Sequence, residues 1–365
     1  MTLRMESIVA ARTTFNGREV DYFSGTGYLG LQSHPAVLSA AQDALQRYGL
    51  TTATSRGGYG EHPLYDELER QACAYFGTEK MLYFASGYMG ISVLTQPLHH
   101  PNDHIFIDSS AHFSLWDAAQ ATNHPVTPFH HLSADSLAEN LRRELLLNER
   151  PLVISDGVFP ISGEIAPLPD YLALVNQYNG LVLLDDAHAA GVLGEHGRGT
   201  PEYYHIDDEH CHTSATLSKA LGGYGGVICG AADWIENLDQ NARICVGASP
   251  PPLTIAAASA RALEIARTTP QLRQTLWENV RLARSGLRQL GWELPDTPVP
   301  ILCLGLRPGI NLEMLRTGLF EQGIAVSHVR NYTSTPAGGA LRIAIFATHS
   351  AEQINHLIEE LARML

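Results

Sequence analysis

Lysine is almost absent from this sequence: of its 24 lysine and arginine residues only Lys80 and Lys219 are lysines. Chemistry that needs a primary amine therefore has two candidates. Long apolar runs are missing as well, since none reaches the roughly 18 residues that a membrane-spanning helix requires. The N-terminus also lacks the apolar core of a signal peptide. We expect a cytoplasmic protein without a membrane partner.

Cysteine and positive charge are also scarce. The five cysteines are odd in number and widely spaced, which favours reduced thiols over a disulfide framework. The formal net charge is −14, and the basic residues form no block along the chain. Nucleic acid is therefore not expected as a partner.

The chain does have 365 residues and an apolar fraction of 45%, enough for two domains. Apolar runs at 81–84, 104–107, 152–154, 181–184, 213–217 and 227–229 alternate with helical patterns. This alternation predicts an α/β fold with a mostly parallel central sheet and helices on both faces.

The pattern changes after about residue 250. A long helix at 270–290, strand-like runs at 301–306, 323–329 and 340–346, and a final amphipathic helix capped by Ser350 predict a smaller α+β domain. We predict an N-terminal segment (1–45) that packs with this small domain, a large domain (46–250) and the small C-terminal domain (251–365).

The stretch Gly25-Thr-Gly-Tyr-Leu-Gly30 has the G-x-G-x-x-G spacing of dinucleotide-binding loops. Such a loop opens a helix at its third glycine, and an acid follows about 20 residues later at the end of the next strand. Here the helical pattern begins only near Pro35, and Asp43 lies inside it. The context favours ordinary turn glycines.

The stretch Thr216-Leu-Ser-Lys-Ala-Leu-Gly-Gly223 places Lys219 between an apolar run and a glycine-rich turn, where the backbone can approach a ligand closely. A lysine that forms a Schiff base must be held near its carbonyl partner and partly desolvated. Because arginine fills nearly every other basic position, we interpret Lys219 as retained for its amine. Lys80 is interpreted as a surface residue.

Polar side chains follow the apolar run 181–184. Ligands of open α/β sheets bind at the carboxyl ends of strands, so Asp185, Asp186 and His188 are candidates for a site. The two aspartates could bind a metal, cap the next turn or pair with a cationic ring nitrogen. A second cluster of possible metal ligands is interpreted as a polar loop: His205, Asp207, Asp208, His210, Cys211 and His212.

Two more strand ends carry candidates. Ser86, Gly87 and Tyr88 precede a probable helix, where backbone N–H groups suit a phosphate. His112 follows another strand and could stack on a flat ligand or be satisfied within a loop. Together with the amine and the carboxylate, a phosphate cradle and a ring platform are the parts that hold pyridoxal 5'-phosphate (PLP). No metal is predicted.

Four stretches carry a family resemblance: Leu184-Asp-Asp-Ala-His188, Gly194-Glu-His-Gly-Arg-Gly199, Thr216-Leu-Ser-Lys-Ala-Leu-Gly-Gly223 and Leu341-Arg-Ile-Ala-Ile-Phe-Ala-Thr-His349. Their order and spacing resemble the PLP-dependent α-oxoamine synthases, in the class II aminotransferase group. The group includes 8-amino-7-oxononanoate synthase and 2-amino-3-ketobutyrate CoA ligase. The resemblance runs from about Asp21 to the C-terminus. It implies a fold-type I transferase that works as a homodimer with a shared active site.

The resemblance also implies roles for single residues. Lys219 would form the internal aldimine and move protons at the substrate Cα. Asp185 would pair with the pyridine nitrogen, His188 would bind the phenolic oxygen, and His112 would stack on the ring. The phosphate would be surrounded by Ser86, Gly87, Tyr88 and Thr216, with Ser249 reaching it from the neighbouring subunit.

The reaction implied is a C-acyl transfer: a small amino acid condenses with an acyl thioester, on CoA or a carrier, through a quinonoid carbanion to give an aminoketone. Arg342 falls where the family binds the amino-acid carboxylate. Two positions depart from the family. Thr26 stands where it has an asparagine that helps to hold that carboxylate, and Pro160 replaces a serine near the cofactor. These departures keep an aminotransferase, or another Cα-modifying PLP enzyme, as the alternative and leave the substrates open.

Overall fold

The computed structural model describes residues 3–98 and 100–365. Within this part of the chain the largest sheet has seven strands, in the spatial order β3 (Lys80–Phe84), β9 (Gly226–Gly230), β8 (Cys211–Thr216), β7 (Leu181–Asp185), β6 (Arg150–Asp156), β4 (Asp103–Asp108) and β5 (Val126–Phe129). The strands from β8 to β5 pair in parallel, and β9 is antiparallel to both neighbours. The predicted mostly parallel α/β sheet is confirmed.

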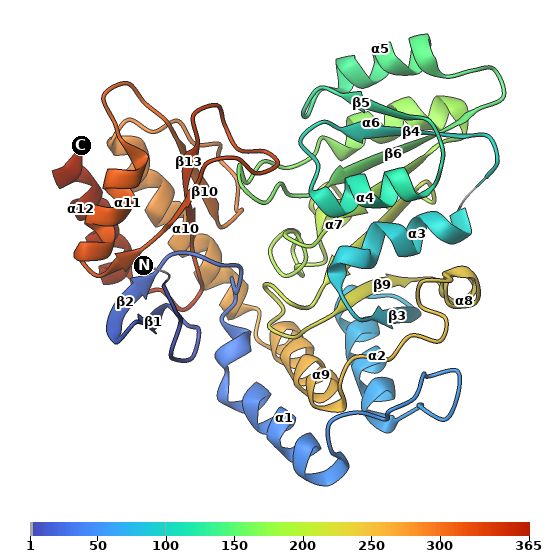
Figure 1. The fold of residues 1–365 in the computed structure, drawn as a ribbon, viewed down its shortest axis with the longest axis horizontal. Coiled ribbons are helices and arrows are strands. Elements are labelled where there is room, and N and C mark those ends of the chain that lie inside the picture. The colour runs from blue at the N-terminus through green and yellow to red at the C-terminus, as the bar shows by residue number, and fades with distance from the viewer. Residues whose placement is uncertain (1–2, 99) are drawn as a thin grey trace.

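Helices cover both faces of this sheet (Figure 1). They are α2 (Pro63–Phe76), η2 (Gly87–Met89), α3 (Gly90–Leu98), α4 (Phe113–Ala121), α5 (Ala134–Glu144), α6 (Leu168–Val175), η3 (Asn176–Tyr178), α7 (Thr200–Tyr203) and α8 (Ala232–Asn241). Ile105 belongs to a hydrophobic cluster that includes residues of α3, α4 and α8, whereas its neighbour Phe106 belongs to one that includes residues of α5 and α6. The two-residue repeat of a strand explains this, and it lets an apolar strand be buried on both sides.

The smaller α+β part of the molecule contains two three-stranded sheets. One has the order β10 (Ile301–Gly305), β13 (Ala340–Ala344) and β12 (Ser327–Val329), and the other β1 (Arg12–Phe15), β2 (Arg18–Tyr22) and β11 (Ile324–Ala325). Its helices are α10 (Gln271–Gln289), α11 (Leu312–Glu321) and α12 (Ala351–Met364). The expected strand at 323–329 is divided, because β11 and β12 belong to different sheets. The capping box predicted at Ser350 is present, with Gln353 as its partner.

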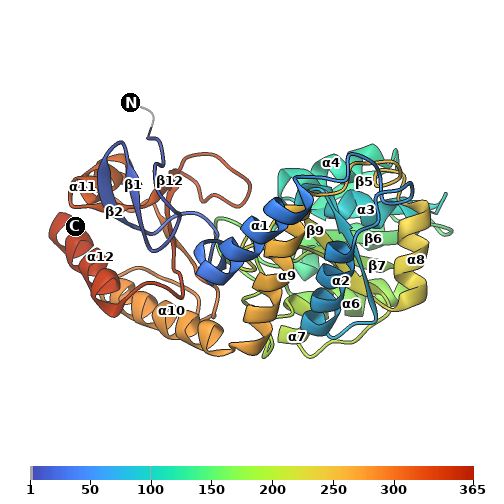
Figure 2. The same ribbon diagram turned by 90° about the horizontal axis from the view of Figure 1, so that it is seen from below.

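The N-terminal strands lie beside the C-terminal elements, since β2 pairs in parallel with β11 (Figure 1). After η1 (Leu31–Ser33), α1 (Pro35–Tyr48) packs along α9 (Leu253–Thr268), which also packs on α2. Figure 2 shows α9 and α10 leading in succession from the large domain to the small one. No helix in the described residues is long and apolar enough to cross a bilayer.

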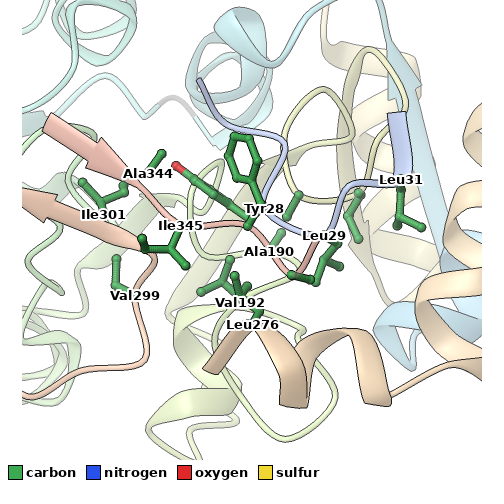
Figure 3. Close-up of a cluster of buried hydrophobic side chains, with 14 of the residues drawn as sticks. Tyr28, Leu29, Leu31, Ala190, Val192, Leu276, Val299, Ile301, Ala344 and Ile345 are labelled. Atoms are coloured by element: carbon green, nitrogen blue, oxygen red, sulfur yellow. The ribbon is translucent and has the colours of Figure 1, made fainter. Parts of the chain in front are cut away.

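One hydrophobic cluster joins the two parts of the molecule. Tyr28 and Leu29 are buried between Val192, from the large domain, and Val299 and Ile345, from the small one (Figure 3). The core is therefore continuous across residue 250, and the boundaries drawn at 45 and 250 remain predictions. The segment that contains Tyr28 is fixed by packing on both sides, which matters for the site beneath it.

Candidate active site

The carboxyl ends of four neighbouring strands bring acidic and polar residues to one edge of the large sheet. The strands β4, β6 and β7 end at Asp108, Asp156 and Asp185. The register places Asp156 opposite Asp185, and Asp185 opposite Ser214 of β8. The predicted strand-end residues therefore meet at this edge, as expected for a parallel sheet.

Lys219 follows β8 in a tight turn and is partly buried. The turn is closed by hydrogen bonds from the Leu217 N–H to the Gly225 carbonyl (2.9 Å) and from the Gly223 N–H to the Leu217 carbonyl (2.7 Å). Burial lowers the pKa of the Lys219 amine, while the carboxylates of Asp185 and Asp156 oppose that shift. The amine therefore sits close to two acids and loses its proton more readily than a surface lysine.

Lys80 has the opposite surroundings. Its side chain is 43% exposed, and its Nζ lies 2.8 Å from a carboxylate oxygen of Glu236. This contact raises the pKa of Lys80. Such an amine is protonated near neutral pH and is a poor nucleophile.

The two adjacent aspartates differ in what they contact. The Asp186 carboxylate accepts hydrogen bonds from the hydroxyl (2.6 Å) and the N–H (2.8 Å) of Thr200, so it has the capping role. Burial raises the pKa of Asp186 to about 7. Asp185 accepts a hydrogen bond from the Ala187 N–H (2.9 Å), and its carboxylate is under the influence of Lys219. Asp185 is therefore the acid of the pair that is left for a ligand.

Asp156 is a third buried acid, and the sequence reasoning missed it. It accepts a hydrogen bond from the backbone N–H of His112 (2.8 Å). Burial, and then repulsion from Asp185, raise the pKa of Asp156 well above its usual value. Its position two residues after the apolar run 152–154 was the available signal, because this run ends at the same sheet edge as 181–184.

His188 belongs to a buried hydrogen-bonded chain. Its Nδ1 lies 2.7 Å from the Tyr28 hydroxyl oxygen, and that oxygen accepts a hydrogen bond from Nη2 of Arg342 (3.2 Å). Burial, then the charges of Lys219 and Arg342, lower the pKa of His188 well below its usual value. The imidazole is thus neutral, and a hydroxyl proton given to Nδ1 leaves Nε2–H as a donor towards a ligand.

His112 is the N-cap of α4 and contacts a loop of the small domain. Its Nδ1 accepts a hydrogen bond from the Ser114 N–H (3.2 Å), so its Nε2–H faces the Tyr332 hydroxyl oxygen at 2.7 Å. Burial, and then Lys219, lower the pKa of His112. The Tyr332 ring also packs edge-on against Phe113, with ring centroids 5.2 Å apart. No sequence pattern links Tyr332 to His112, which lies 220 positions away.

The predicted phosphate residues lie where β3 leads into η2. The Ser86 side chain accepts a hydrogen bond from the Tyr88 N–H (3.3 Å). Gly87 lies against Thr216 so closely that a Cβ on Gly87 would be 2.7 Å from the Thr216 Cβ. The Tyr88 hydroxyl donates a hydrogen bond to Asp117 (2.6 Å). These four predicted residues therefore form one cradle beside the Lys219 turn.

Ser249 is the predicted residue that the single chain does not bring to this cradle. It is exposed and lines a cavity of about 460 Å³. The cavity is bordered by Ala85, next to the cradle, and by residues 55–57. Within one chain, Ser249 therefore lines this cavity and has no hydrogen bond with the cradle among the described residues.

Comparison with known proteins identifies the family. Residues 23–361 match the family model for class I and II aminotransferases. An 8-amino-7-oxononanoate synthase of Trichlorobacter lovleyi is 33% identical over 365 residues, covering 100% of this chain and 93% of that protein. A serine palmitoyltransferase of Sphingobacterium spiritivorum is 32% identical over 350 residues, covering 96% and 87%. The chain is a member of the class I and II aminotransferase family, among its α-oxoamine synthases.

The fold of this α-oxoamine synthase agrees with solved structures. Serine palmitoyltransferase from S. paucimobilis with bound PLP–myriocin aldimine superimposes with a TM-score of 0.92 at 26% identity, over 100% of this chain and 92% of that one. The fold-type I architecture inferred from the sequence is confirmed.

The two departures from the family pattern lie around Arg342. Its guanidinium donates from Nε to the Pro160 carbonyl (2.7 Å) and from Nη1 to the Gly25 carbonyl (3.0 Å), beside Thr26. With the Tyr28 contact, three of the five N–H groups of Arg342 are engaged. One N–H remains on each terminal nitrogen, which suits bidentate binding of a carboxylate. Gly25 of the G-x-G-x-x-G stretch therefore helps to hold the Arg342 guanidinium through its backbone carbonyl.

The donor set of this α-oxoamine synthase fits PLP. An amine, a carboxylate beside it, a neutral imidazole with a free Nε2–H, and a serine-capped helix start packed on Thr216 are the groups that the cofactor needs. No group of three His, Cys, Asp or Glu side chains that could hold a metal occurs in 3–98 and 100–365.

Proposed function

We propose that this protein condenses a small amino acid with an acyl thioester to give an aminoketone, with PLP bound through Lys219. The observation that carries the proposal is the partly buried Lys219 in the turn after β8, at the sheet edge where β6 and β7 end in Asp156 and Asp185. Bound PLP withdraws electrons from the substrate Cα, so that a proton can be removed there. The names and likeness of the relatives support the acyl-transfer reaction over transamination.

The surroundings of Lys219 suit proton transfer. A general base works best when its pKa lies near the working pH, and burial moves the amine in that direction. With PLP bound, Asp185 would pair with the ring nitrogen and favour its protonated form, and the Nε2–H of His188 would donate to the phenolic oxygen. His112 would support the face of the ring, and the phosphate would be bound by Ser86, Gly87, Tyr88 and Thr216.

Arg342 is proposed to bind the amino-acid carboxylate. Its side chain is buried, and its three protein hydrogen bonds fix the plane of the guanidinium. A fixed planar donor pair holds a carboxylate in one orientation and thereby directs the Cα–H bond of the substrate. Thr26 lies beside this carboxylate site.

We further propose a homodimer in which Ser249 of one subunit completes the phosphate site of the other. Leu50, Tyr59 and Val246 are more than 60% exposed, and their loops are joined by a hydrogen bond from the Leu253 N–H to the Leu50 carbonyl (2.9 Å). Exposed apolar residues gathered beside a cavity favour an interface with a second copy. Sedimentation should give a dimer, and a monomeric active enzyme would contradict this.

A reducing compartment, the cytoplasm, is proposed from the cysteines. All five are unpaired and partly buried. Free thiols in this number are typical of a cytosolic protein.

The test of the reaction uses holoenzyme with glycine, L-alanine or L-serine and a panel of acyl-CoA esters. We expect release of free CoA thiol that depends on the amino acid, and a product whose mass equals an aminoketone. Formation of a 2-oxo acid with conversion of the cofactor to its amine form would instead identify an aminotransferase.

A further inference from the structure

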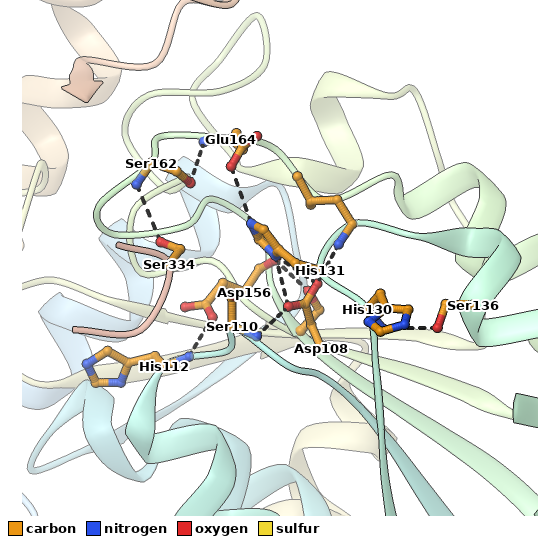
Figure 4. A network of polar contacts seen from close by, with 12 residues as sticks. Asp108, Ser110, His112, His130, His131, Ser136, Asp156, Ser162, Glu164 and Ser334 are labelled. Carbon is orange, nitrogen blue, oxygen red and sulfur yellow. Dashed lines mark hydrogen bonds and ion pairs between the residues drawn. The ribbon is translucent and has the colours of Figure 1, made fainter. Parts of the chain in front are cut away.

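A second charged cluster lies beside the site, and the proposed reaction does not use it. His131 follows β5 and lies between two carboxylates: its Nδ1 is 2.9 Å from Asp108 Oδ1, and its Nε2 is 3.3 Å from Glu164 Oε2 (Figure 4). Asp108 is fully buried at the end of β4 and also accepts the N–H groups of Ser110 (2.8 Å) and Leu132 (2.9 Å). The cluster is therefore anchored in the large domain on one side.

The charge state of His131 follows from hydrogen-bond chemistry. Both neighbours are carboxylates that accept hydrogen bonds, whereas a neutral imidazole has only one N–H to give. Only the imidazolium can donate to Asp108 and Glu164 at once. In agreement, the hydrogen bonds that His131 donates to both carboxylates, together with their negative charges, outweigh burial and raise the pKa of His131 to about 9.

Glu164 belongs to a segment that we call the bridging loop, residues 157–166. Its base is held by hydrogen bonds from the Gly157 N–H to the Asp185 carbonyl (2.8 Å) and from the Ala166 N–H to the Gly157 carbonyl (3.0 Å). Phe159 of the loop is buried and contacts the His131 ring edge-on, with centroids 4.3 Å apart. His131 thus contacts the loop twice.

The tip of the bridging loop contacts the small domain. The Pro160 carbonyl accepts the Nε–H of Arg342 (2.7 Å), and the Ser162 N–H donates to the Ser334 hydroxyl (3.4 Å). Gly163 approaches β10 so closely that a Cβ on it would lie 2.6 Å from the Ile301 carbonyl oxygen. The loop therefore connects the His131 cluster to the guanidinium proposed to bind substrate.

We propose that His131 is a positioning residue for the amino-acid substrate: its positive charge, shared between Asp108 and Glu164, holds the bridging loop so that Pro160 fixes the direction of Arg342. This rests on the proposed function of Arg342 as the carboxylate site. Loss of the charge leaves one carboxylate facing a nitrogen lone pair. The side-chain contact to Glu164 is then lost, and the tip of the bridging loop is held less firmly while its backbone hydrogen bonds remain. Amino-acid affinity then falls, while the cofactor stays bound by other residues.

Other ionisable groups interact with the two carboxylates of the cluster, so the pH dependence has to be assigned by substitution. Asp156 and Tyr171 interact with Asp108, and Cys303 interacts with Glu164. Burial raises the pKa of Tyr171 away from neutrality and that of Cys303 to about 11. Burial also raises the pKa of Asp156 well above its usual value, so the His131→Gln variant is needed to separate the two groups. A change in affinity near pH 9 that disappears with His131 is therefore assigned to His131.

The experiment compares holoenzyme of wild type, His131→Gln and His130→Gln. His130 is the neighbouring histidine but is exposed, so it is a matched control. Affinity for glycine, L-alanine and L-serine is measured from the visible absorbance change of the bound cofactor, from roughly pH 7 to pH 10. The free amino acid ionises in the same way in every measurement, so a difference between variants in the pH dependence is due to the protein.

We expect His131→Gln to weaken amino-acid affinity about tenfold or more at neutral pH and to flatten its dependence on pH, with kcat changed by less than about threefold. His130→Gln should match wild type. Wild-type affinity and pH dependence in His131→Gln would overturn the proposal.

Glu164→Gln is a second variant on the exposed side of the cluster, and it decides the matter if His131→Gln fails to fold. The amide oxygen of the substituted side chain still accepts a hydrogen bond from His131, but the negative charge of Glu164 is lost. The pKa of His131 should therefore be lower, and the fall in amino-acid affinity should move to lower pH. An unchanged pH profile would overturn the proposal. Arg342→Lys separates the two claims: normal amino-acid affinity in that variant would refute the carboxylate site itself, whichever way His131→Gln behaves.

Discussion

Replacing Tyr28 by phenylalanine tests the buried chain that joins His188 to Arg342. The substitution removes one oxygen atom and keeps the ring, which is completely buried in the core between the two domains. No cavity of consequence is created. The change therefore acts on the two hydrogen bonds of the hydroxyl, to His188 (2.7 Å) and to Arg342 (3.2 Å).

The magnitude follows from the groups left behind. Nδ1 of His188 and one N–H of Arg342 lose their partner in a buried place, and an unsatisfied buried polar group costs about 1–3 kcal/mol. If the reacting geometry depends on both side chains, this cost corresponds to a fall in kcat/KM of roughly 5- to 150-fold. The imidazole also loses the partner that selects its Nε2–H tautomer, so the visible absorbance of the bound cofactor should shift.

Tyr171→Phe is the matched control. Tyr171 is another fully buried tyrosine, and its hydroxyl has no hydrogen-bond partner in the part of the chain that the structure describes. Its removal should leave kcat/KM and the absorbance unchanged. The assay is steady-state release of CoA thiol together with an absorbance spectrum. Equal behaviour of Tyr28→Phe and Tyr171→Phe would refute the role given to the chain.

Two further predictions concern the strand ends and the small-domain loop. Asp185→Asn should lower turnover at least about tenfold, since the loss of about 1.4 kcal/mol of charge pairing is enough for that change. Asp186→Asn should mainly lower the melting temperature, because the Asp186 carboxylate accepts two hydrogen bonds from Thr200. Turnover lost only in Asp186→Asn would contradict the assignment. Tyr332→Phe should lower kcat/KM by a few-fold, because it removes the hydrogen bond between His112 and the Tyr332 hydroxyl, which is worth about 0.5–1.5 kcal/mol. The affinity for the cofactor, measured by titration, should not change. Release of the cofactor from this variant would contradict the prediction.

The main sheet and part of the site could be predicted from the sequence because both follow from local pattern. Apolar runs alternating with helical patterns imply parallel strands, and parallel strands bring their carboxyl ends to one edge. Lys219 and Asp185 follow such runs, so their meeting was predictable without knowledge of the strand order. Asp156 obeys the same rule and could have been included.

The remaining site residues depend on contacts that no local pattern records. Tyr28 reaches His188 and Arg342 only because its segment is buried between the domains, and Tyr332 reaches His112 across 220 positions. In the sequence, Pro160 indicated only that a serine of the family pattern is replaced. In the structure its backbone carbonyl holds Arg342, a contribution for which side-chain identity gives no signal. Partners that use backbone atoms or long-range packing are thus the part that sequence reasoning does not supply.

The central claim is that Lys219 carries the cofactor, and the scarcity of lysine makes it directly testable. Holoenzyme is reduced with borohydride, digested and analysed by mass spectrometry. We expect the mass of reduced PLP on the peptide that contains Lys219 and none on the peptide that contains Lys80. Label on Lys80, or a protein that shows no visible band with added PLP and takes up no label, would contradict it.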